Sequence, residues 1–170
     1  RRALLTAGPT FEPIDPVRYI GNRSSGRQGI ELAVAARDRG AEVTLVAAHL
    51  ELPAPSGVRL VAAGTAEELR AAMLAAAAEA DVVVMAAAVA DYRTRDVSPT
   101  KIKKDAQGDR LDLALVRNPD ILAELTAARR PGQVYIGFAA ETEPDGEALV
   151  ALGRAKAARK GVDLLVLNRV

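Results

Sequence analysis

The chain has 170 residues, of which 49% are hydrophobic and 3% aromatic, so we expect one domain whose core consists of small aliphatic side chains. The formal net charge of +1 argues against a nucleic-acid surface and against a polybasic membrane anchor. The absence of cysteine excludes a disulfide framework, a thiol nucleophile and a cysteine-type metal site.

The beginning of the chain indicates its cellular context. Arg1 and Arg2 lead directly into a strand pattern without a signal peptide, and no apolar run approaches the roughly 20 residues of a membrane span. We therefore expect a cytoplasmic protein with no membrane partner. A start without Met and without a leader suggests one domain of a longer chain.

A strand pattern at residues 3–7 and a helix pattern at residues 30–39 enclose a loop rich in glycine and serine. This loop contains Ser24, Ser25 and Gly26. Free main-chain N–H groups and the positive end of a helix dipole meet at such a loop, and both favour a phosphate or a carboxylate. The glycine spacing matches neither the dinucleotide motif nor the P-loop motif, so an ordinary helix start is the alternative.

An unusually long link, residues 9–20, separates the first strand from the glycine loop. Long ordered links in compact domains are often functional. Arg18 lies near the end of this link, and a guanidinium there suits bidentate binding of the phosphate of a substrate. A surface arginine without a ligand is the alternative.

Strand and helix patterns alternate as far as residue 87. Strands are expected at residues 42–46, 58–61 and 81–87, and the last is apolar throughout, as in a strand that is covered on both faces. A helix is expected to begin at Thr65, where Glu68 completes a capping box. This order predicts an α/β fold with a Rossmann-like, doubly wound and mostly parallel sheet.

The α/β pattern breaks at about residues 92–110. Residues 100–104 and 111–115 alternate in polarity, so we expect an inserted hairpin or a mobile flap beside the sheet. Lys101 lies in the first of these segments. A mobile cationic arm suits a nucleoside triphosphate, whose charge must be neutralised during attack on its α-phosphate, whereas a solvated run of charges is the alternative.

Regular structure is expected to resume at Asn118. Asn118 and Pro119 have the pattern of a helix cap and a first helical residue, and the helix would carry Ile121. The remaining elements are two strands and the helix between them, at residues 133–138, 163–167 and about 147–160. The chain as a whole, residues 1–170, is predicted to form one domain.

Ligands of an open α/β sheet bind beyond the carboxyl ends of its strands. Asp91 lies at such a place and is a candidate to accept a hydrogen bond from a base or a ribose, or to ligate Mg²⁺, with a strand-end cap as the alternative. A dinucleotide site would need an acidic residue near Ala47 and Ala48, so a nicotinamide cofactor is disfavoured. His49, the one histidine, is expected to be a loop residue rather than a catalyst.

Several long motifs follow one another along the chain. They are the segments at residues 7–20, 22–26 (Asn-Arg-Ser-Ser-Gly), 86–92, 101–104 (Lys-Ile-Lys-Lys), 118–122 (Asn-Pro-Asp-Ile-Leu) and 137–142 (Gly-Phe-Ala-Ala-Glu-Thr). In this series the chain resembles the bacterial phosphopantothenate–cysteine ligase family, the phosphopantothenoylcysteine synthetases of coenzyme A biosynthesis. The resemblance covers nearly the whole chain and is more specific than the glycine loop alone.

The resemblance implies a CTP-dependent ligase that acts in two steps with Mg²⁺. The carboxylate of 4′-phosphopantothenate first attacks the α-phosphate of CTP, which gives an acyl-cytidylate and diphosphate. The amine of L-cysteine then displaces CMP and forms the amide.

The resemblance also implies roles for individual residues. Asn22 would hold the acyl intermediate and polarise its carbonyl group, and Lys101 would serve the cytidylylation step. The implied nucleotide site consists of Met85, Ala86, Ala87, Asp91, Lys101, Asn118, Pro119, Asp120, Ile121, Phe138, Lys156 and Lys160. The resemblance gives no metal ligands.

Partners are implied as well. Members of the family are homodimers whose sites take residues from both subunits, so a homodimer is expected. Bacterial members are usually fused behind an FMN-dependent decarboxylase domain and continue past the position of Val170, which implies a longer bifunctional chain. The competing interpretation is a non-catalytic module that binds a nucleotide or a dinucleotide.

Overall fold

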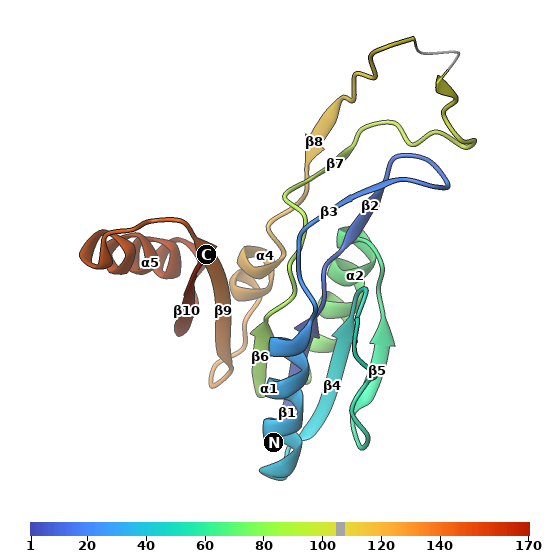
Figure 1. Cartoon of the computed structure of the whole chain (residues 1–170). Coiled ribbons are helices and arrows are strands. Elements are labelled where there is room, and N and C mark those ends of the chain that lie inside the picture. The colour runs from blue at the N-terminus through green and yellow to red at the C-terminus, as the bar shows by residue number, and fades with distance from the viewer. Residues whose placement is uncertain (105–107) are drawn as a thin grey trace.

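The computed structural model describes residues 1–104 and 108–170. Parallel strands form a six-stranded sheet in the order β10-β9-β6-β1-β4-β5 (Figure 1). The strands are β1 (Arg2–Ala7), β4 (Glu42–Ala47), β5 (Arg59–Ala62), β6 (Val82–Met85), β9 (Val134–Glu141) and β10 (Leu164–Arg169). The predicted Rossmann-like α/β fold is confirmed.

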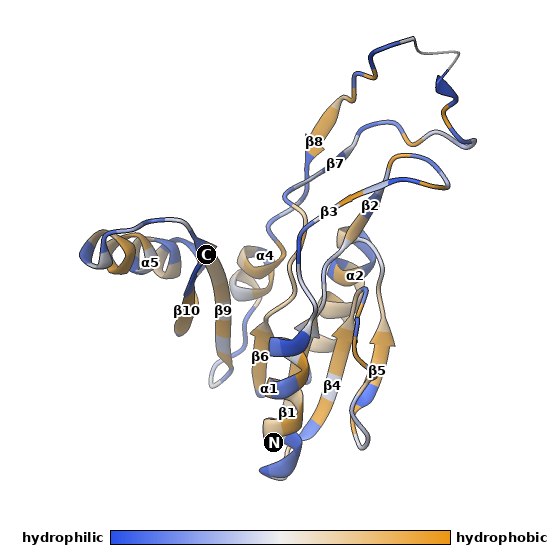
Figure 2. Cartoon of the chain, in the orientation of Figure 1, coloured by the Kyte–Doolittle hydropathy of each residue, from blue (hydrophilic) through white to orange (hydrophobic). Residues whose placement is uncertain are grey.

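Helices cover both faces of this sheet. They are α1 (Arg27–Asp38), α2 (Ala66–Ala77), α4 (Ile121–Ala127) and α5 (Gly146–Lys160). Ala33 of α1 packs with Leu5 and Leu45 on one face, while Leu69 of α2 and Leu125 of α4 pack on the other. Figure 2 shows the resulting apolar strands between amphipathic helices. Within the described ranges, no helix combines the length and the apolar character that a membrane crossing requires.

The start of α2 confirms the predicted capping box. The hydroxyl of Thr65 accepts a hydrogen bond from the N–H of Glu68, and the carboxylate of Glu68 accepts one from the N–H of Thr65. A second carboxylate at this helix start was not predicted: the buried side chain of Glu12 accepts a hydrogen bond from the N–H of Ala66 at 2.8 Å. The long link is thereby anchored to the start of α2.

β1 lies at the point where the order of the strands reverses: the chain first adds β4 and β5 on one side of β1 and then adds β6, β9 and β10 on the other. β1 pairs with β4 on one side and with β6 on the other, although β6 follows β4 and β5 in the sequence. Crevices at the carboxyl ends of strands that flank such a switch point are where open α/β sheets bind ligands. A ligand-binding site is therefore expected at the loops after β1 and β6.

The glycine loop brings α1 close to the end of β1. Gly26, the residue before α1, has a φ of 77°, in the left-handed region that favours glycine. A Cβ atom at Gly29 would lie 2.6 Å from the main-chain oxygen of Thr6 and 2.5 Å from the Cβ of Ala7. Because glycine has no Cβ, the helix start can lie directly against the carboxyl end of the strand.

Gly29→Ala should therefore destabilise the fold. The added methyl group meets main-chain atoms that cannot move aside easily, and overpacking of this kind typically costs about 1–3 kcal/mol. We expect the thermal midpoint to fall by about 3–10 °C. Gly146→Ala is the matched control, because the nearest atom lies 4.0 Å from its added Cβ and alanine favours the helix. Equal midpoints for Gly29→Ala and the parent protein would contradict the close packing.

Two small antiparallel pairs project beyond the sheet (Figure 1). β2 (Phe11–Pro13) pairs with β3 (Tyr19–Gly21), so the long link is a hairpin, which the sequence analysis missed. Phe11 stacks between Tyr19 and His49, with ring centroids 3.9 Å apart in each pair. His49 is thus a loop residue that stacks on the hairpin.

The second pair consists of β7 (Tyr92–Thr94), at the start of the predicted insertion, and β8 (Leu115–Arg117), which lies beyond its predicted end at about residue 110. We call the chain from β7 to β8 the arm. The predicted strand at residues 100–104 is wrong: residues 101–103 form no strand, and of residues 111–115 only Leu115 belongs to β8. The alternation in the first segment instead reflects the half-buried Ile102, which is held by side chains of the β2–β3 hairpin.

The predicted cap of the helix after the arm is also wrong. α4 begins after Asp120, whose side chain accepts a hydrogen bond from the N–H of Ala123. Asn118 is buried, and its Nδ2 donates to the main-chain oxygen of Ala90 at 2.8 Å. This contact with a distant loop uses the amide that would have capped the helix.

Candidate active site

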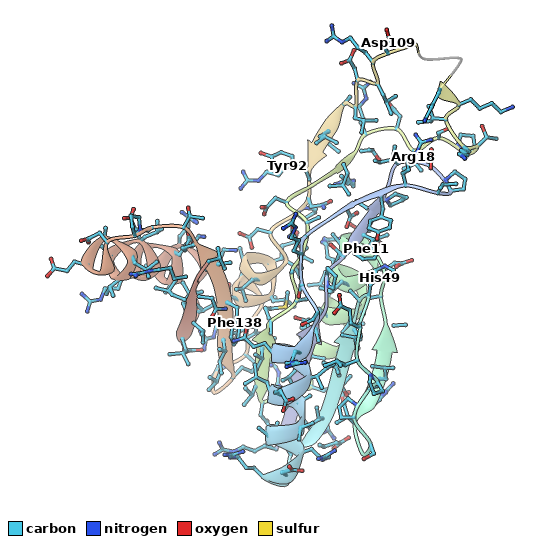
Figure 3. The ribbon with its side chains drawn as sticks, in the orientation of Figure 1. Phe11, Arg18, His49, Tyr92, Asp109 and Phe138 are labelled. Atoms are coloured by element: carbon cyan, nitrogen blue, oxygen red, sulfur yellow. The ribbon has the colours of Figure 1, made fainter. Side chains whose placement is uncertain are left out.

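A cavity of about 780 Å³ lies beyond the carboxyl ends of β6 and β9. Its walls come from the glycine loop, the loop after β6, the start of α4 and the last turns of α5. Phe138, which lies on β9, marks this region in Figure 3. The cavity is therefore at the edge of the sheet that the topology indicated.

Most of the predicted site residues line this one cavity. They are Asn22, Ser24, Met85, Ala86, Ala87, Asp91, Asn118, Pro119, Asp120, Ile121, Phe138, Lys156 and Lys160. Ser25 and Gly26 line an adjacent hollow that shares Ser24 with the cavity. Arg18 and Lys101 line neither. The structure thus brings together residues that lie up to 138 positions apart in the sequence.

Several polar residues of the cavity were missed by the sequence analysis. They are Arg23, Gln28, Arg117, Arg159 and Asn168. Helical spacing was available as a signal for Arg159, because it lies three residues after Lys156 and so shares its face of α5. Arg23 lies within a quoted motif, whereas nothing local distinguishes Arg117 or Asn168.

Two buried threonines of β1 and its following loop hold the loop after β6. The hydroxyl of Thr6 accepts a hydrogen bond from the N–H of Ala87 at 3.0 Å, and that of Thr10 accepts one from the N–H of Ala90 at 2.9 Å. Both threonine side chains are fully buried. The cavity wall formed by this loop is therefore built on rigid elements, as precise binding requires.

Asn22 lies at the edge of this wall. Its Nδ2 donates a hydrogen bond to the main-chain oxygen of Val89 at 3.1 Å, and its side chain is exposed to the cavity region. The amide nitrogen carries two protons, of which this bond uses one. A neutral donor held in place in this way can stabilise negative charge that develops on a nearby oxygen.

The first turn of α1 is a second donor group in this region. The hydroxyls of Ser24 and Ser25 accept hydrogen bonds from the N–H groups of Gly26 and Arg27, at 3.3 and 3.4 Å. The residue before the helix provides no side-chain cap. The serine hydroxyls thus occupy these two N–H groups, whereas the positive dipole end of the helix still favours an anion.

Both predicted lysines of α5 are paired with carboxylates at the cavity wall. Lys156 binds Glu141, and the Nζ of Lys160 lies 3.2 Å from an oxygen of Asp120. The lysine side chains are 28% and 25% exposed, so they remain accessible from the cavity. A phosphate group that enters can share these cations with the carboxylates or replace the carboxylates.

The side-chain amide of Asn118 forms hydrogen bonds within the protein through both its oxygen and its nitrogen. Its Nδ2 donates to Ala90, and its side-chain oxygen accepts a hydrogen bond from the guanidinium of Arg93 at 2.9 Å. Its main-chain N–H donates to the main-chain oxygen of Asp91. Asn118 thus joins the arm, the loop after β6 and the start of α4. Any nucleotide contact at this position is left to the main chain beside it.

Arg18 and Lys101 lie on the parts that project from the sheet. Figure 3 places Arg18 at the outer end of the β2–β3 hairpin, next to the arm and away from Phe138. Its guanidinium donates to the main-chain oxygen of Ile102 at 2.7 Å and lies 3.5 Å from the carboxylate of Asp15. Lys101 is exposed on the arm. The predicted contacts of these two residues with substrates stay predictions.

The pKa of the Asp15 carboxyl group is lowered. Burial by itself would raise the pKa of Asp15, but main-chain hydrogen bonds from Ile102, Val17 and Arg18, together with the charge of Arg18, outweigh it and lower the pKa. A carboxyl group with a lowered folded-state pKa stabilises the fold above its ordinary pKa, and this contribution is lost only as the pH falls through the lowered value. The contacts of Asp15 are therefore independent of pH near neutrality.

A preformed metal cage is absent from residues 1–104 and 108–170, where no three His, Cys, Asp or Glu side chains lie together suitably. Mg²⁺ is usually held by one or two carboxylates together with the phosphates of a substrate. Asp91, an exposed carboxylate at the cavity, fits that role. The residues present are thus compatible with Mg²⁺ that enters with a nucleotide.

Another hollow of about 780 Å³ lies at the opposite edge of the sheet, by the start of β1. Arg2 joins the acidic groups of this hollow: its side chain pairs with Glu42 and Glu79, and its main-chain N–H donates to Asp81. This hollow contains neither a quoted motif nor a helix start with free donors. The cavity beyond β6 and β9 is therefore the candidate active site.

Comparison with known proteins identifies the family to which the chain belongs. Residues 1–170 match the family described as the DNA/pantothenate metabolism flavoprotein C-terminal domain. The chain is 49% identical over 176 residues to the coenzyme A biosynthesis bifunctional protein CoaBC of Mycobacterium tuberculosis, and 47% identical over 168 residues to that of Escherichia coli. These alignments cover 100% and 98% of the chain but 42% and 40% of the relatives, so the chain spans about two fifths of their length.

Solved structures show the same fold. The C-terminal domain of a CoaBC protein superposes with a TM-score of 0.84 at 36% identity, covering 99% of this chain and 76% of that one. A Cab2 variant crystallised in complex with phosphopantothenate-cysteine superposes with a TM-score of 0.82 over 100% of this chain and 73% of that one, but its 18% identity supports the fold alone. The chain therefore belongs to the family of DNA/pantothenate metabolism flavoprotein C-terminal domains.

Proposed function

We propose that this chain is the ligase domain of a coenzyme A biosynthesis protein and that it joins 4′-phosphopantothenate to L-cysteine with CTP as co-substrate. The observation that supports the proposal most is that four separated motif segments, at residues 22–26, 86–92, 118–122 and 137–142, contribute to one cavity. Resemblance along the sequence alone does not require these segments to meet in space. Because the relatives are named as bifunctional proteins, we also propose that this domain is fused to an FMN-dependent decarboxylase domain. We propose a cytoplasmic location for the whole protein.

CTP would bind in the part of the cavity between β6 and α4. Asp91 and the main chain around Asn118 offer acceptors and donors that suit the amino and carbonyl groups of cytosine. The phosphates would lie toward Lys156 and Lys160, with Mg²⁺ neutralising further charge. Asp91 as a ligand of Mg²⁺, instead of an acceptor for the base, is the alternative role of this carboxylate. The carboxylate of phosphopantothenate attacks the α-phosphorus, and diphosphate leaves.

The amide step would take place beside Asn22. The cysteine amine attacks the acyl carbon of the acyl-cytidylate, the amine loses a proton, and CMP leaves with the bridging oxygen. Negative charge develops on the carbonyl oxygen during this attack, and the free Nδ2 proton of Asn22 would stabilise it. The helix start beside Ser24 and Ser25 would hold a phosphate group of a substrate.

We further propose a homodimer in which the arm reaches the cavity of the partner subunit. Lys101 lies outside its own cavity, and the arm exposes apolar side chains that water does not favour, among them Tyr92 (52% exposed), Leu111 (42%) and Leu115 (46%). A second copy of this chain would cover these side chains and supply its cavity with Lys101. A swing of the arm toward its own cavity is the alternative.

CTP should stabilise the chain in a thermal-shift titration with Mg²⁺, whereas ATP should do so weakly and NAD(H) and NADP(H) should not. A ligand stabilises by RT ln(1 + [L]/Kd), which is about 2.7 kcal/mol at a hundredfold excess over Kd. With phosphopantothenate and cysteine present, CTP should also support formation of the amide, detected by mass spectrometry. Stabilisation by NAD(H) alone, without product from CTP, would favour the non-catalytic module instead.

A further inference from the structure

Asp15 has a fully buried side chain in the turn between β2 and β3. Its Oδ1 accepts hydrogen bonds from the main-chain N–H groups of Val17 and Arg18, both at 2.8 Å. Asparagine forms this kind of turn as well as aspartate, because only one side-chain oxygen is required. The turn alone does not explain why a charged carboxylate is buried at this position.

The second carboxylate oxygen binds the arm. Oδ2 of Asp15 accepts a hydrogen bond from the N–H of Ile102 at 3.1 Å and lies 3.5 Å from the guanidinium of Arg18. The same guanidinium donates to the main-chain oxygen of Ile102 at 2.7 Å. One ion pair of the hairpin thus holds both main-chain polar groups of a single arm residue. We call this arrangement the Asp15–Arg18–Ile102 clasp.

Among the described residues, the clasp is the outermost of three hydrogen-bonded contacts between hairpin and arm. Nearer the sheet, the hydroxyl of Thr94 donates to the main-chain oxygen of Pro13 at 2.6 Å, and the N–H of Ser98 donates to Ile14 at 2.9 Å. These two contacts hold Thr94 and Ser98, which lie in the first part of the arm, against the hairpin. The lysine-rich segment beyond them depends on the clasp.

Lys101 and Lys103 flank the residue that the clasp holds, and both side chains are exposed. Because both the N–H and the C=O of Ile102 are bound, the direction of its peptide groups is fixed, and so is the start of each lysine side chain. A cation that must meet a phosphate needs this kind of fixed origin, since a displacement of about 1 Å can cost 10²-fold in rate.

We propose that Asp15 is a positioning residue which, through the main chain of Ile102, fixes the lysine segment on the hairpin and sets the place from which Lys101 acts. The kinetic part of this inference rests on the proposed ligase function. The structural part does not, because the clasp can be tested without any substrate.

Asp15→Asn separates the two roles of the carboxylate. The amide oxygen can still accept from the N–H groups of Val17 and Arg18, but the amide nitrogen then faces the N–H of Ile102, and two donors cannot bind each other. The turn is kept and the clasp is broken. Asp96→Asn is the matched control, because this carboxylate lies on the arm itself, where it is exposed and pairs with Arg95 without contacting the hairpin turn.

The rate of cleavage by a lysine-specific protease measures whether the clasp is formed. The chain has five lysines, three of them in the segment of residues 101–104. Mass spectrometry would measure cleavage after Lys101 relative to cleavage after Lys104. The relative rate should become about tenfold faster in Asp15→Asn, because this variant loses a hydrogen bond to a charged group of the clasp. It should stay unchanged in Asp96→Asn, which keeps the clasp. Arg18→Ala removes the other half of the clasp and provides the test if Asp15→Asn does not fold.

The kinetic readout separates positioning from a structural role. Diphosphate release from CTP and phosphopantothenate should fall about tenfold in kcat for Asp15→Asn, while pre-formed acyl-cytidylate reacts with cysteine at the parental rate. Unchanged cleavage after Lys101 would overturn the clasp. Faster cleavage with unchanged diphosphate release would overturn the positioning of Lys101. If the parent protein releases no diphosphate, the ligase proposal fails, and the protease result still decides the clasp.

Discussion

Replacing Asn22 by aspartate should slow amide formation by about 10²–10³-fold and leave cytidylylation much less affected. The substitution keeps the size of the side chain but replaces the donor Nδ2 by an oxygen that carries negative charge. Loss of one such donor typically costs 10²–10³ in kcat, and the new charge repels the developing oxyanion as well. The acyl-cytidylate should therefore accumulate when CTP, phosphopantothenate and cysteine are all present.

Rapid quenching followed by mass spectrometry would detect this accumulation. Asn168→Asp is the matched control, since Asn168 also lines the cavity but its amide donates to the side chain of Gln28 instead of the loop after β6. Its effect on amide formation should be less than tenfold. Normal turnover of Asn22→Asp would remove Asn22 from the proposed mechanism.

Lys101→Gln should abolish most of the first step and spare the second. Glutamine keeps much of the length of lysine but lacks the charge, so the charge that builds up on the transferred phosphoryl group is no longer neutralised. We expect diphosphate release to fall by about 10²-fold or more. Pre-formed acyl-cytidylate, which has already passed that step, should still react with cysteine. Lys104→Gln, two residues beyond the clasp, is the control for a general loss of positive charge from the arm.

Combining the two variants tests whether Lys101 serves the partner subunit. If it does, a mixed dimer of Asn22→Asp and Lys101→Gln has one intact cavity, so random mixing restores up to about a quarter of the parental sites. If Lys101 serves its own cavity, both cavities of the mixed dimer are defective. Freshly mixed homodimers control for acyl-cytidylate that diffuses between them. Activity that appears only after the subunits are refolded together would support the shared site, and its absence would favour the swinging arm.

Local patterns predicted the sheet, whereas the family resemblance supplied most of the cavity residues. The apolar run at residues 81–87 and the capping box at Thr65 are determined by neighbours in the sequence, and both were predicted correctly in type. The residues that the resemblance implied meet in one cavity because the carboxyl ends of parallel strands lie at one edge of a sheet, and the motifs lie at or just after those strand ends.

The wrong predictions concern side chains whose partners are far away in the sequence. Asn118 has the local pattern of a helix cap, but Ala90, 28 positions earlier, takes its amide. The alternation around Ile102 is typical of a strand, but its partners are Asp15 and Arg18 instead of a neighbouring strand. Neither competition is visible in a single sequence, because each depends on which loops the fold brings together.

The most direct test of the proposed function follows one oxygen atom. Phosphopantothenate labelled with ¹⁸O in its carboxylate is incubated with the chain, CTP, Mg²⁺ and cysteine, and the CMP is analysed by mass spectrometry. Because the carboxylate attacks the α-phosphorus and CMP leaves with the bridging oxygen, the account predicts one ¹⁸O atom in each CMP formed. Amide formation with unlabelled CMP, or without any need for CTP, would contradict it.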